Sequence, residues 1–364
     1  MSTVRLAKRE SPLPGGQLLA FAIGTAVALL LGAVLLLFAG HSPLTVYAEM
    51  ADGAFGSTTA WSNTLNQAVP LGLAGLAVAV AGSMGLWNIG AEGQIVAGAI
   101  AGAWVARVAP DLGGPVLIPA MIFAGVIGGA LLGVGPALAR AHLGVNEIIT
   151  TLMLNEVAIR VVRYLVNGPW KDPTSVGFPV APELPSQSAL PTLFARTNIG
   201  IFVAAAVLAV FGFMAARSKW GFELRVAGSS ARAAEYVGIS LKRKIVTVLV
   251  LSGAIAGLVG GLRLGSTDRL TEGISEGWGF AGIIVAALAL MKPSGVALVA
   301  VAFGALRVGG LALRVQGVPA SIAEIIQALV LLGALAAAVF VNYRIERSTP
   351  SPQVETASVE RASA

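Results

Sequence analysis

The stretch that decides the fold runs from Leu65 to Ala91 and reads LNQAVPLGLAGLAVAVAGSMGLWNIGA. It carries no charged residue over a length that exceeds the roughly 20 apolar residues of a membrane-spanning helix. Its many small residues are typical of helices that associate in lipid, where close backbone contact replaces the hydrophobic drive. The stretch therefore predicts a transmembrane helix.

Similar apolar runs recur along the whole chain, which is 56% hydrophobic and only 12% charged. A soluble domain has about a quarter of its residues charged, so this chain has too few polar residues to cover a water-soluble globule. Together with Leu65–Ala91, the runs predict about ten spans. The others cover residues 18–40, 93–106, 112–139, 145–166, 197–216, 245–262, 277–291, 294–313 and 325–343. We therefore expect an all-α, polytopic membrane protein.

Charge placement predicts the topology. With both termini in the cytoplasm and an even number of spans, most of the 24 Lys and Arg residues fall in cytoplasmic segments, as the positive-inside rule requires. The chain then divides into a cytoplasmic N-terminus (1–17), a transmembrane domain (18–343) and a polar, disordered cytoplasmic tail (344–364). Within the transmembrane domain, a proline-rich outer loop covers 167–198 and a basic cytoplasmic segment covers 217–244.

Residues 85–94, GLWNIGAEGQ, place polar side chains between two apolar runs. Such groups are costly at membrane depth unless protein buries them or they face water. One interpretation is a broken element that lines a translocation path, with Trp87, Asn88, Glu92 and Gln94 near it. The other is a cytoplasmic turn in which Glu92 caps the following helix. The residues themselves leave both open.

A polar stripe follows in residues 144–156, GVNEIITTLMLNE. Glu147, Thr151 and Asn155 recur every four residues, so they share one face of a helix, and Asn146 precedes them. Hydroxyl and amide groups in a stripe suit a path for a polar, uncharged solute. They equally suit hydrogen bonds that hold neighbouring helices together.

The chain offers little for catalysis. It has no G-x-x-x-x-G-K-[ST] motif for binding ATP. It has no cysteine and only two histidines, so we expect no metal site. Residues 277–282, GWGFAG, match G-x-G-x-x-G, but the dinucleotide fingerprint requires a preceding strand, and here a membrane-apolar run follows. We expect a transport protein that is not an enzyme and binds no cofactor directly.

Several motifs, taken together, resemble those of one transporter family. Residues 221–240, GFELRVAGSSARAAEYVGIS, are similar to the cytoplasmic loop of ABC importer permeases in the branched-chain amino acid, simple sugar and nucleoside group. Further segments resemble motifs of that group in the same order; they are 85–94, 145–155, 168–173, 252–258 and 279–288.

Within this group, the NIGAEGQ motif and the GP-x-x-DP start of the outer loop resemble one branch most. It is the longer permease of nucleoside uptake systems that use a basic-membrane-protein-type lipoprotein. One departure lies at 288–293, where LALMKP stands in place of the more familiar Leu-Gly-Arg-x-x-Pro.

The resemblance implies a type II ABC importer-like fold with inverted repeats, in the bacterial cytoplasmic (inner) membrane. It implies an ABC ATPase, a second and different permease and an external substrate-binding lipoprotein as partners, and no nucleic acid. In the family, a short helix in the cytoplasmic loop docks on the ATPase. The matching candidates here are Arg225, Gly228, Arg232, Glu235, Tyr236 and Gly238.

The implied function is inward transport of nucleosides or a related small polar solute, with ATP used by the partner subunit. The alternatives are a permease of the same group for simple sugars or branched-chain amino acids, and, from another class, an ion-coupled secondary transporter. The sequence does not identify the solute, and it leaves open whether the permease pair is a homodimer or a heterodimer.

Overall fold

A computed structural model describes residues 3–8, 16–175, 179–315 and 318–348 of the chain. Its contacts divide the chain into two units. One combines the two ends, up to Gly32 and from Ala328, and the other covers Ala33–Gln327.

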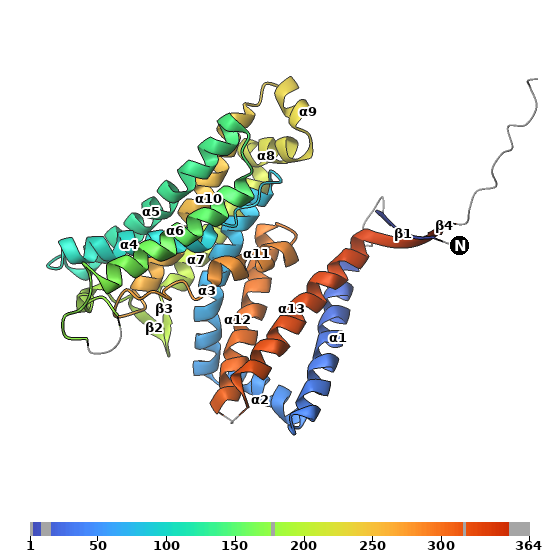
Figure 1. The fold of residues 1–364 in the computed structure, drawn as a ribbon, viewed down its shortest axis with the longest axis horizontal. Helices are drawn as coiled ribbons and strands as arrows, with labels where there is room; N and C mark the ends of the chain where they lie inside the picture. The colour runs from blue at the N-terminus through green and yellow to red at the C-terminus, as the bar shows by residue number, and fades with distance from the viewer. Residues whose placement is uncertain (1–2, 9–15, 176–178, 316–317, 349–364) are drawn as a thin grey trace, which may run out of the picture. The chain divides into compact units, whose positions relative to one another are not determined.

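The described residues are almost entirely helical (Figure 1). A helix covers most of each apolar run that the sequence predicts as a span, although the helix in Leu65–Ala91 ends at Gly82. These helices are α1 (Gly16–Phe38), α3 (Thr58–Gly82), α4 (Ala91–Val108), α5 (Gly114–Leu143), α6 (Glu147–Asn167), α7 (Gly200–Arg217), α10 (Leu241–Leu264), α11 (Trp278–Leu288), α12 (Pro293–Val315) and α13 (Ala320–Asn342). The predicted all-α class is confirmed.

Five helices of the described residues are long and apolar enough to cross a membrane by themselves: α3, α5, α7, α10 and α12. Helices α1 and α2 (Pro43–Phe55), which meet at an angle of 118°, pass the same test as one broken span and would bring the number to six. The polytopic membrane fold is therefore confirmed, whereas the number of about ten spans stays a prediction.

Small residues make a tight helix crossing between α5 and α10. A Cβ at Gly129 would collide with the backbone of Gly253 and Gly257, and a Cβ at Gly257 would collide with that of Gly125. The glycines at spacing four therefore let the two backbones touch, as helices in lipid require.

Helices α4 and α11 both begin inside the bundle. Along α3, Ala74 lies against Gly282 and Gly82 lies against Met291, so α11 runs in the direction of α3 and starts beside its middle. Gly279, near the start of α11, packs on the backbone of Glu92 in the first turn of α4. A long helix, a non-helical return and a helix that starts internally thus occur twice, in α3–α4 and in α10–α11.

The two long links differ in structure. The described part of the outer loop holds a 3₁₀ turn, η1 (Ser186–Ser188), and a small hairpin of β2 (Thr192–Phe194) and β3 (Thr197–Asn198). The basic segment forms α8 (Lys219–Ser229) and α9 (Ala231–Tyr236), which Figure 1 shows together at one end of the larger unit.

In the smaller unit, β1 (Thr3–Lys8) pairs antiparallel with β4 (Tyr343–Ser348). Nearby, α1 and α13 pack closely, because a Cβ at Gly333 would collide with the Gly24 carbonyl. The segments before α1 and after α13 therefore lie on the same side, as an even number of spans requires. Most of the predicted polar tail, residues 349–364, lies outside the described residues, as do 1–2 and 9–15 of the N-terminus.

Candidate functional site

The polar break before α4 is tied to three helices. After α3 ends at Gly82, residues 83–90 form no helix, and Gly85 has a φ of 70°. Asn88 is fully buried and donates from Nδ2 to Gln94 Oε1 and to Ser252 Oγ of α10, both at 2.7 Å. Ser252 in turn donates to the Ala77 carbonyl of α3 at 2.5 Å. These side chains hold the break in place.

The stripe on α6 supports the same break. Asn155 Oδ1 accepts from the backbone N–H of Gly93, and its Nδ2 donates to the carbonyl of Ile89, both at 2.8 Å. Thr151 bonds within its own helix, to the Glu147 carbonyl at 2.6 Å. We refer to Asn88, Gln94, Asn155 and Ser252 as the amide junction.

The start of α6 has a different role. Asn146 is exposed and caps α6, accepting from the Ile148 N–H at 2.9 Å. Glu147 is buried; one of its oxygens accepts from the backbone N–H of Trp87 at 3.3 Å and the other lies 3.2 Å from Arg140 Nε. These contacts join the end of α5 and the start of α6 to the turn that precedes α4.

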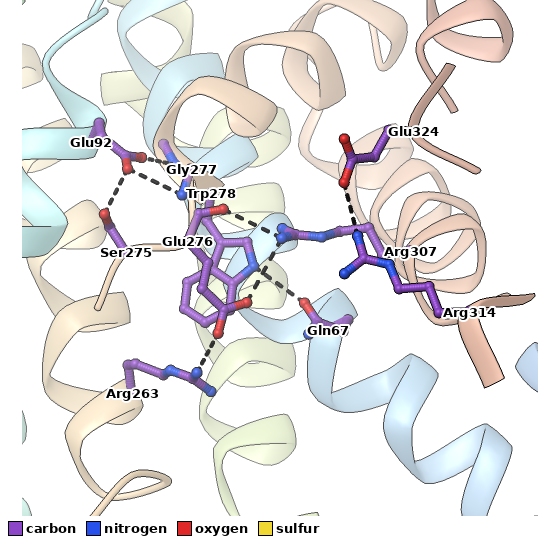
Figure 2. Close-up of polar contacts among 11 residues, drawn as sticks. Gln67, Glu92, Arg263, Ser275, Glu276, Gly277, Trp278, Arg307, Arg314 and Glu324 are labelled. Carbon is purple, nitrogen blue, oxygen red and sulfur yellow. Dashed lines mark hydrogen bonds and ion pairs between the residues drawn. The ribbon is translucent and has the colours of Figure 1, made fainter. Parts of the chain in front are cut away.

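Glu92 joins the starts of α4 and α11 (Figure 2). It lies in the first turn of α4 and is only 4% exposed. Its carboxylate accepts from Ser275 Oγ at 2.6 Å and from the backbone N–H groups of Gly277 and Gly279 at 3.2 and 2.7 Å. Glu92 therefore does cap a helix, as the alternative interpretation held, but it caps α11 rather than the helix that it opens.

A second group of polar residues lies beside this contact and carries more charge. Glu276 pairs with Arg263 of α10 and with Arg307 of α12, whose Nη2 lies 3.7 Å from its carboxylate. Trp278 is 2% exposed; its indole N–H donates to Gln67 of α3 at 3.2 Å, and the Arg263 guanidinium lies 4.9 Å from the ring centroid. We call these five residues the charged cluster (Figure 2).

Two cavities border the charged cluster. The loop cavity, of about 370 Å³, lies under the β2–β3 hairpin between α3 and the end of α10; Asn66, Arg196, Ser266 and Trp278 are among its lining residues. The charged cavity, of about 530 Å³, lies beside α12; it is lined by Gln67, Glu276, Arg307, Arg314, Glu324 and Gln327, among others. The four charged side chains of this second lining balance in sign.

The residues that the sequence predicts for the translocation path do not line either cavity. The structure brings six of them together around the break, directs the Glu92 carboxylate to the start of α11, and leaves Asn146 at the exposed start of α6. The six are Trp87, Asn88, Gln94, Glu147, Thr151 and Asn155. Neither the loop cavity nor the charged cavity is lined by any of the eight. The sequence interpretation missed the charged cluster, for which a useful signal was the placement of Arg307 inside an apolar span.

The residues predicted to contact an ATPase divide into three groups. Arg225 donates to the Ala215 carbonyl at the end of α7, and Gly228 packs against the carbonyl of Ser83, so both position α8. Arg232, Glu235 and Tyr236 lie exposed on α9, and Tyr236 reaches 93% exposure. Gly238, with a φ of 80°, turns the chain toward α10.

In the parts of the chain that the structure describes, no group of three acidic, His or Cys side chains is arranged to hold a metal ion. The described residues form a bundle of membrane-spanning helices with buried polar junctions and two polar cavities. This arrangement defines a polytopic membrane protein.

Residues 60–335 match the family model described as "Branched-chain amino acid transport system / permease component", and the chain belongs to this family of ABC transporter permeases. This match confirms the predicted resemblance to ABC importer permeases. It does not support the alternative of an ion-coupled secondary transporter. A permease of this class is a transport component that works with an ATPase and a substrate-binding partner.

Three relatives are similar over most of their length. The glucose ABC transporter permease protein TsgB13 of Haloferax volcanii is 37% identical over 87% of both chains. The guanosine ABC transporter permease protein NupP of Bacillus subtilis is 33% identical over 83% of this chain and 88% of its own. The nucleoside ABC transporter permease protein NupB of Lactococcus lactis subsp. cremoris is 32% identical over 83% and 86%. No solved structure matches the chain.

Proposed function

We propose that this chain is a permease subunit of an ABC importer that moves nucleosides, or a closely related small polar solute, into the cell. Two of the three relatives above are named for guanosine or nucleosides. An external lipoprotein would deliver the solute, and a separate ATPase would bind ATP, so the chain itself would hold no cofactor. We place it in the bacterial cytoplasmic membrane, paired with a second, different permease.

Simple sugars are the second candidate, because the relative named for glucose is 37% identical. Nucleosides and sugars share a ring that carries hydroxyl groups, so one set of polar groups could serve either. Branched-chain amino acids have only the family description in their favour.

The observation that carries the proposal is the charged cluster beside the charged cavity. Charged side chains inside an apolar bundle are costly, and they typically mark the route of a polar solute. Glu276 and Arg307 are each about one-third or less exposed, so both reach the cavity and hold each other. A lining that balances in charge suits a neutral solute with several hydrogen-bonding groups.

The amide junction would then act indirectly. Its side chains bond to one another and to backbone groups of α3, of α4 and of Ile89 in the break, and so fix where α4 begins. Glu92 then joins the start of α4 to that of α11. A polar solute would meet the charged cluster, which those helix starts position.

The decisive experiment compares uptake by cells with and without the gene. We expect labelled uridine and adenosine to enter in a gene-dependent way, and uptake to stop when the partner ATPase is inactivated. Faster gene-dependent uptake of glucose or ribose would assign the chain to the sugar candidate. Gene-dependent uptake of leucine alone would contradict a site for hydroxylated solutes.

The ATPase contact has a separate test. We expect replacement of residues 228–235 by Gly and Ser to release the ATPase during detergent purification, because it removes exposed Arg232 and Glu235 of α9. The matched control replaces the exposed residues 192–196 of the outer hairpin. Equal retention of the ATPase by both variants would contradict the docking role.

A further inference from the structure

A third cavity, of about 880 Å³, lies at the end of the larger unit that carries α8. The ends of α3 and α7, the start of α8 and the turn between α11 and α12 enclose it. Its lining is mainly apolar and includes Val80, Leu208, Phe211, Phe213, Trp220 and Met291. A polar solute has little to bind here, so this cavity is distinct from the charged cavity.

The cavity lies against α7, whose apolar surface is mostly left uncovered by the rest of the described residues. Only 11% of the apolar window of α7 is buried within the chain, and Phe213 is 69% exposed. An apolar hollow left empty forfeits dispersion contacts in proportion to its volume. In a bilayer, hydrocarbon chains are the apolar material available to fill it.

The rim of the cavity is basic. Arg225 of α8 and Lys292 of the α11–α12 turn line it, together with the hydroxyl-bearing Ser83 and Ser294. The bond from Arg225 to the Ala215 carbonyl fixes that side chain at the rim. By the positive-inside rule this end of the bundle is cytoplasmic, where anionic lipids attract basic groups between helices.

The turn that forms one wall is held in an unusual conformation. Leu290 and Met291 have φ values of 53° and 56°, which non-glycine residues rarely adopt. The Met291 side chain lies against Gly82 of α3. The LALMKP stretch departs from the family pattern here, and it supplies both an apolar wall residue and the rim cation Lys292.

We propose that this cavity binds an anionic phospholipid of the cytoplasmic leaflet, with its acyl chains among α3, α7 and α12 and its headgroup at Arg225 and Lys292. Because Trp220 and Leu224 of α8 form part of the lining, the bound lipid supports the segment that carries the predicted ATPase contacts. The lipid site does not depend on which solute is transported.

The first test removes the rim charge. The purified transporter is reconstituted in bilayer discs with equal dioleoyl phosphatidylglycerol and dioleoyl phosphatidylcholine, and the retained lipids are identified by native mass spectrometry. We expect phosphatidylglycerol to be enriched and Lys292→Gln to lower that enrichment about fivefold. The matched control is Lys219→Gln, which removes a highly exposed cation of α8 that does not line the cavity. No enrichment in the wild type, or equal loss in both variants, would overturn the site.

The second test fills the cavity without changing charge. Ala297 lines it, whereas the neighbouring Leu298 is 68% exposed outside it. We expect Ala297→Trp to abolish lipid retention and Leu298→Trp to leave it unchanged. Normal retention of phosphatidylglycerol by a folded Ala297→Trp transporter would contradict the proposal.

A third test separates a lipid from a protein occupant. The chain has no cysteine, so Ala297→Cys gives this subunit a single thiol in the cavity. We expect phosphatidylglycerol to slow its alkylation severalfold relative to phosphatidylcholine. Equally slow alkylation in both lipids and in lipid-free detergent would show that a partner subunit covers the cavity, and would overturn the lipid site.

Discussion

The amide junction and the charged cluster lie on either side of the contact between α4 and α11, yet they differ in chemistry. In the amide junction, neutral side chains are buried and bond to each other or to backbone groups. In the charged cluster, Arg263, Glu276 and Arg307 keep about a third of their surface and border cavities.

This difference separates two roles that polar side chains have in a membrane protein. Groups that bond to one another in a tight space fix the position of helices and leave little capacity for a solute. In the amide junction, Asn88 Oδ1 is buried without a hydrogen-bond partner among the described residues. Groups that share a cavity can exchange a protein partner for a solute at little cost in packing. Changes at the junction should therefore affect folding most, and changes at the cluster should affect transport most.

The largest effect is expected where α4 and α11 touch. In Gly279→Ala, the new Cβ would collide with the backbone of Glu92, which cannot move without shifting α4. We expect a loss of stability of about 3 kcal/mol and a low yield of folded protein. Gly273→Ala is the matched control, because nothing lies within 4 Å of its Cβ position. Thermal unfolding in detergent compares the two, and equal melting temperatures would contradict a tight contact.

A smaller loss is expected from Glu92→Gln. The amide can replace only one of the two accepting oxygens, and its NH₂ would face a backbone N–H at the start of α11. We expect a destabilisation of about 2 kcal/mol with normal uptake per folded transporter. The control Glu156→Gln alters an acid whose side chain is 62% exposed. Lost uptake without lost stability would instead make Glu92 a residue of the path.

Much of this comparison could be predicted from the sequence. Apolar runs located the helices, because every backbone group must be satisfied within lipid. The GLWNIGAEGQ break and the stripe on α6 stand out in the sequence as polar segments among apolar runs, and the structure joins them through Asn155. Short helix α2 was missed, since a segment of 13 residues with Glu49 and Asp52 does not read as a span.

The charged cluster could not be assembled from the sequence, for a physical reason. Its members come from four helices and from the turn before α11, and Gln67 is separated from Trp278 by 211 positions along the chain. No periodicity relates them, because tertiary packing alone sets which helices meet. Residues that share one helix, such as Glu147, Thr151 and Asn155, reveal their common face through spacing. Residues that meet across helices do not.

We expect Arg307→Gln to change stability less than Glu92→Gln does. We expect it to change transport more. Its pair with Glu276 is partly exposed and should contribute about 1 kcal/mol or less. We expect a nearly unchanged melting temperature and a severalfold lower initial rate of uptake, because the charged cavity loses one of its balanced charges. The control is Arg160→Gln, whose side chain is 76% exposed on α6. Normal uptake by Arg307→Gln would remove the charged cluster from the path.

The smallest effect is expected at an ion pair outside the membrane, which sets a baseline for the comparison. The hydrogen bond from Lys244 at the start of α10 holds the pKa of the Glu223 carboxyl in α8 below its usual value. Because the pKa is lowered on folding, the stabilisation is present above the unfolded value of about 4.3 and disappears as the pH falls through the folded value.

Hydrogen exchange of the α8 amides, corrected for intrinsic rates, can measure this effect between about pH 7 and about pH 3, which lies below the unfolded value. We expect faster opening of α8 at the acidic end in the wild type and no such pH dependence in Lys244→Gln. Lys219→Gln is the control, because its ammonium lies 3.9 Å from Glu223 and is 89% exposed. If α8 opened equally at both pH values in the wild type, the Glu223–Lys244 contact would not hold the segment. The position of α8 would then rest on the packing of Gly228 and Leu224 and on the bond from Arg225 to the Ala215 carbonyl.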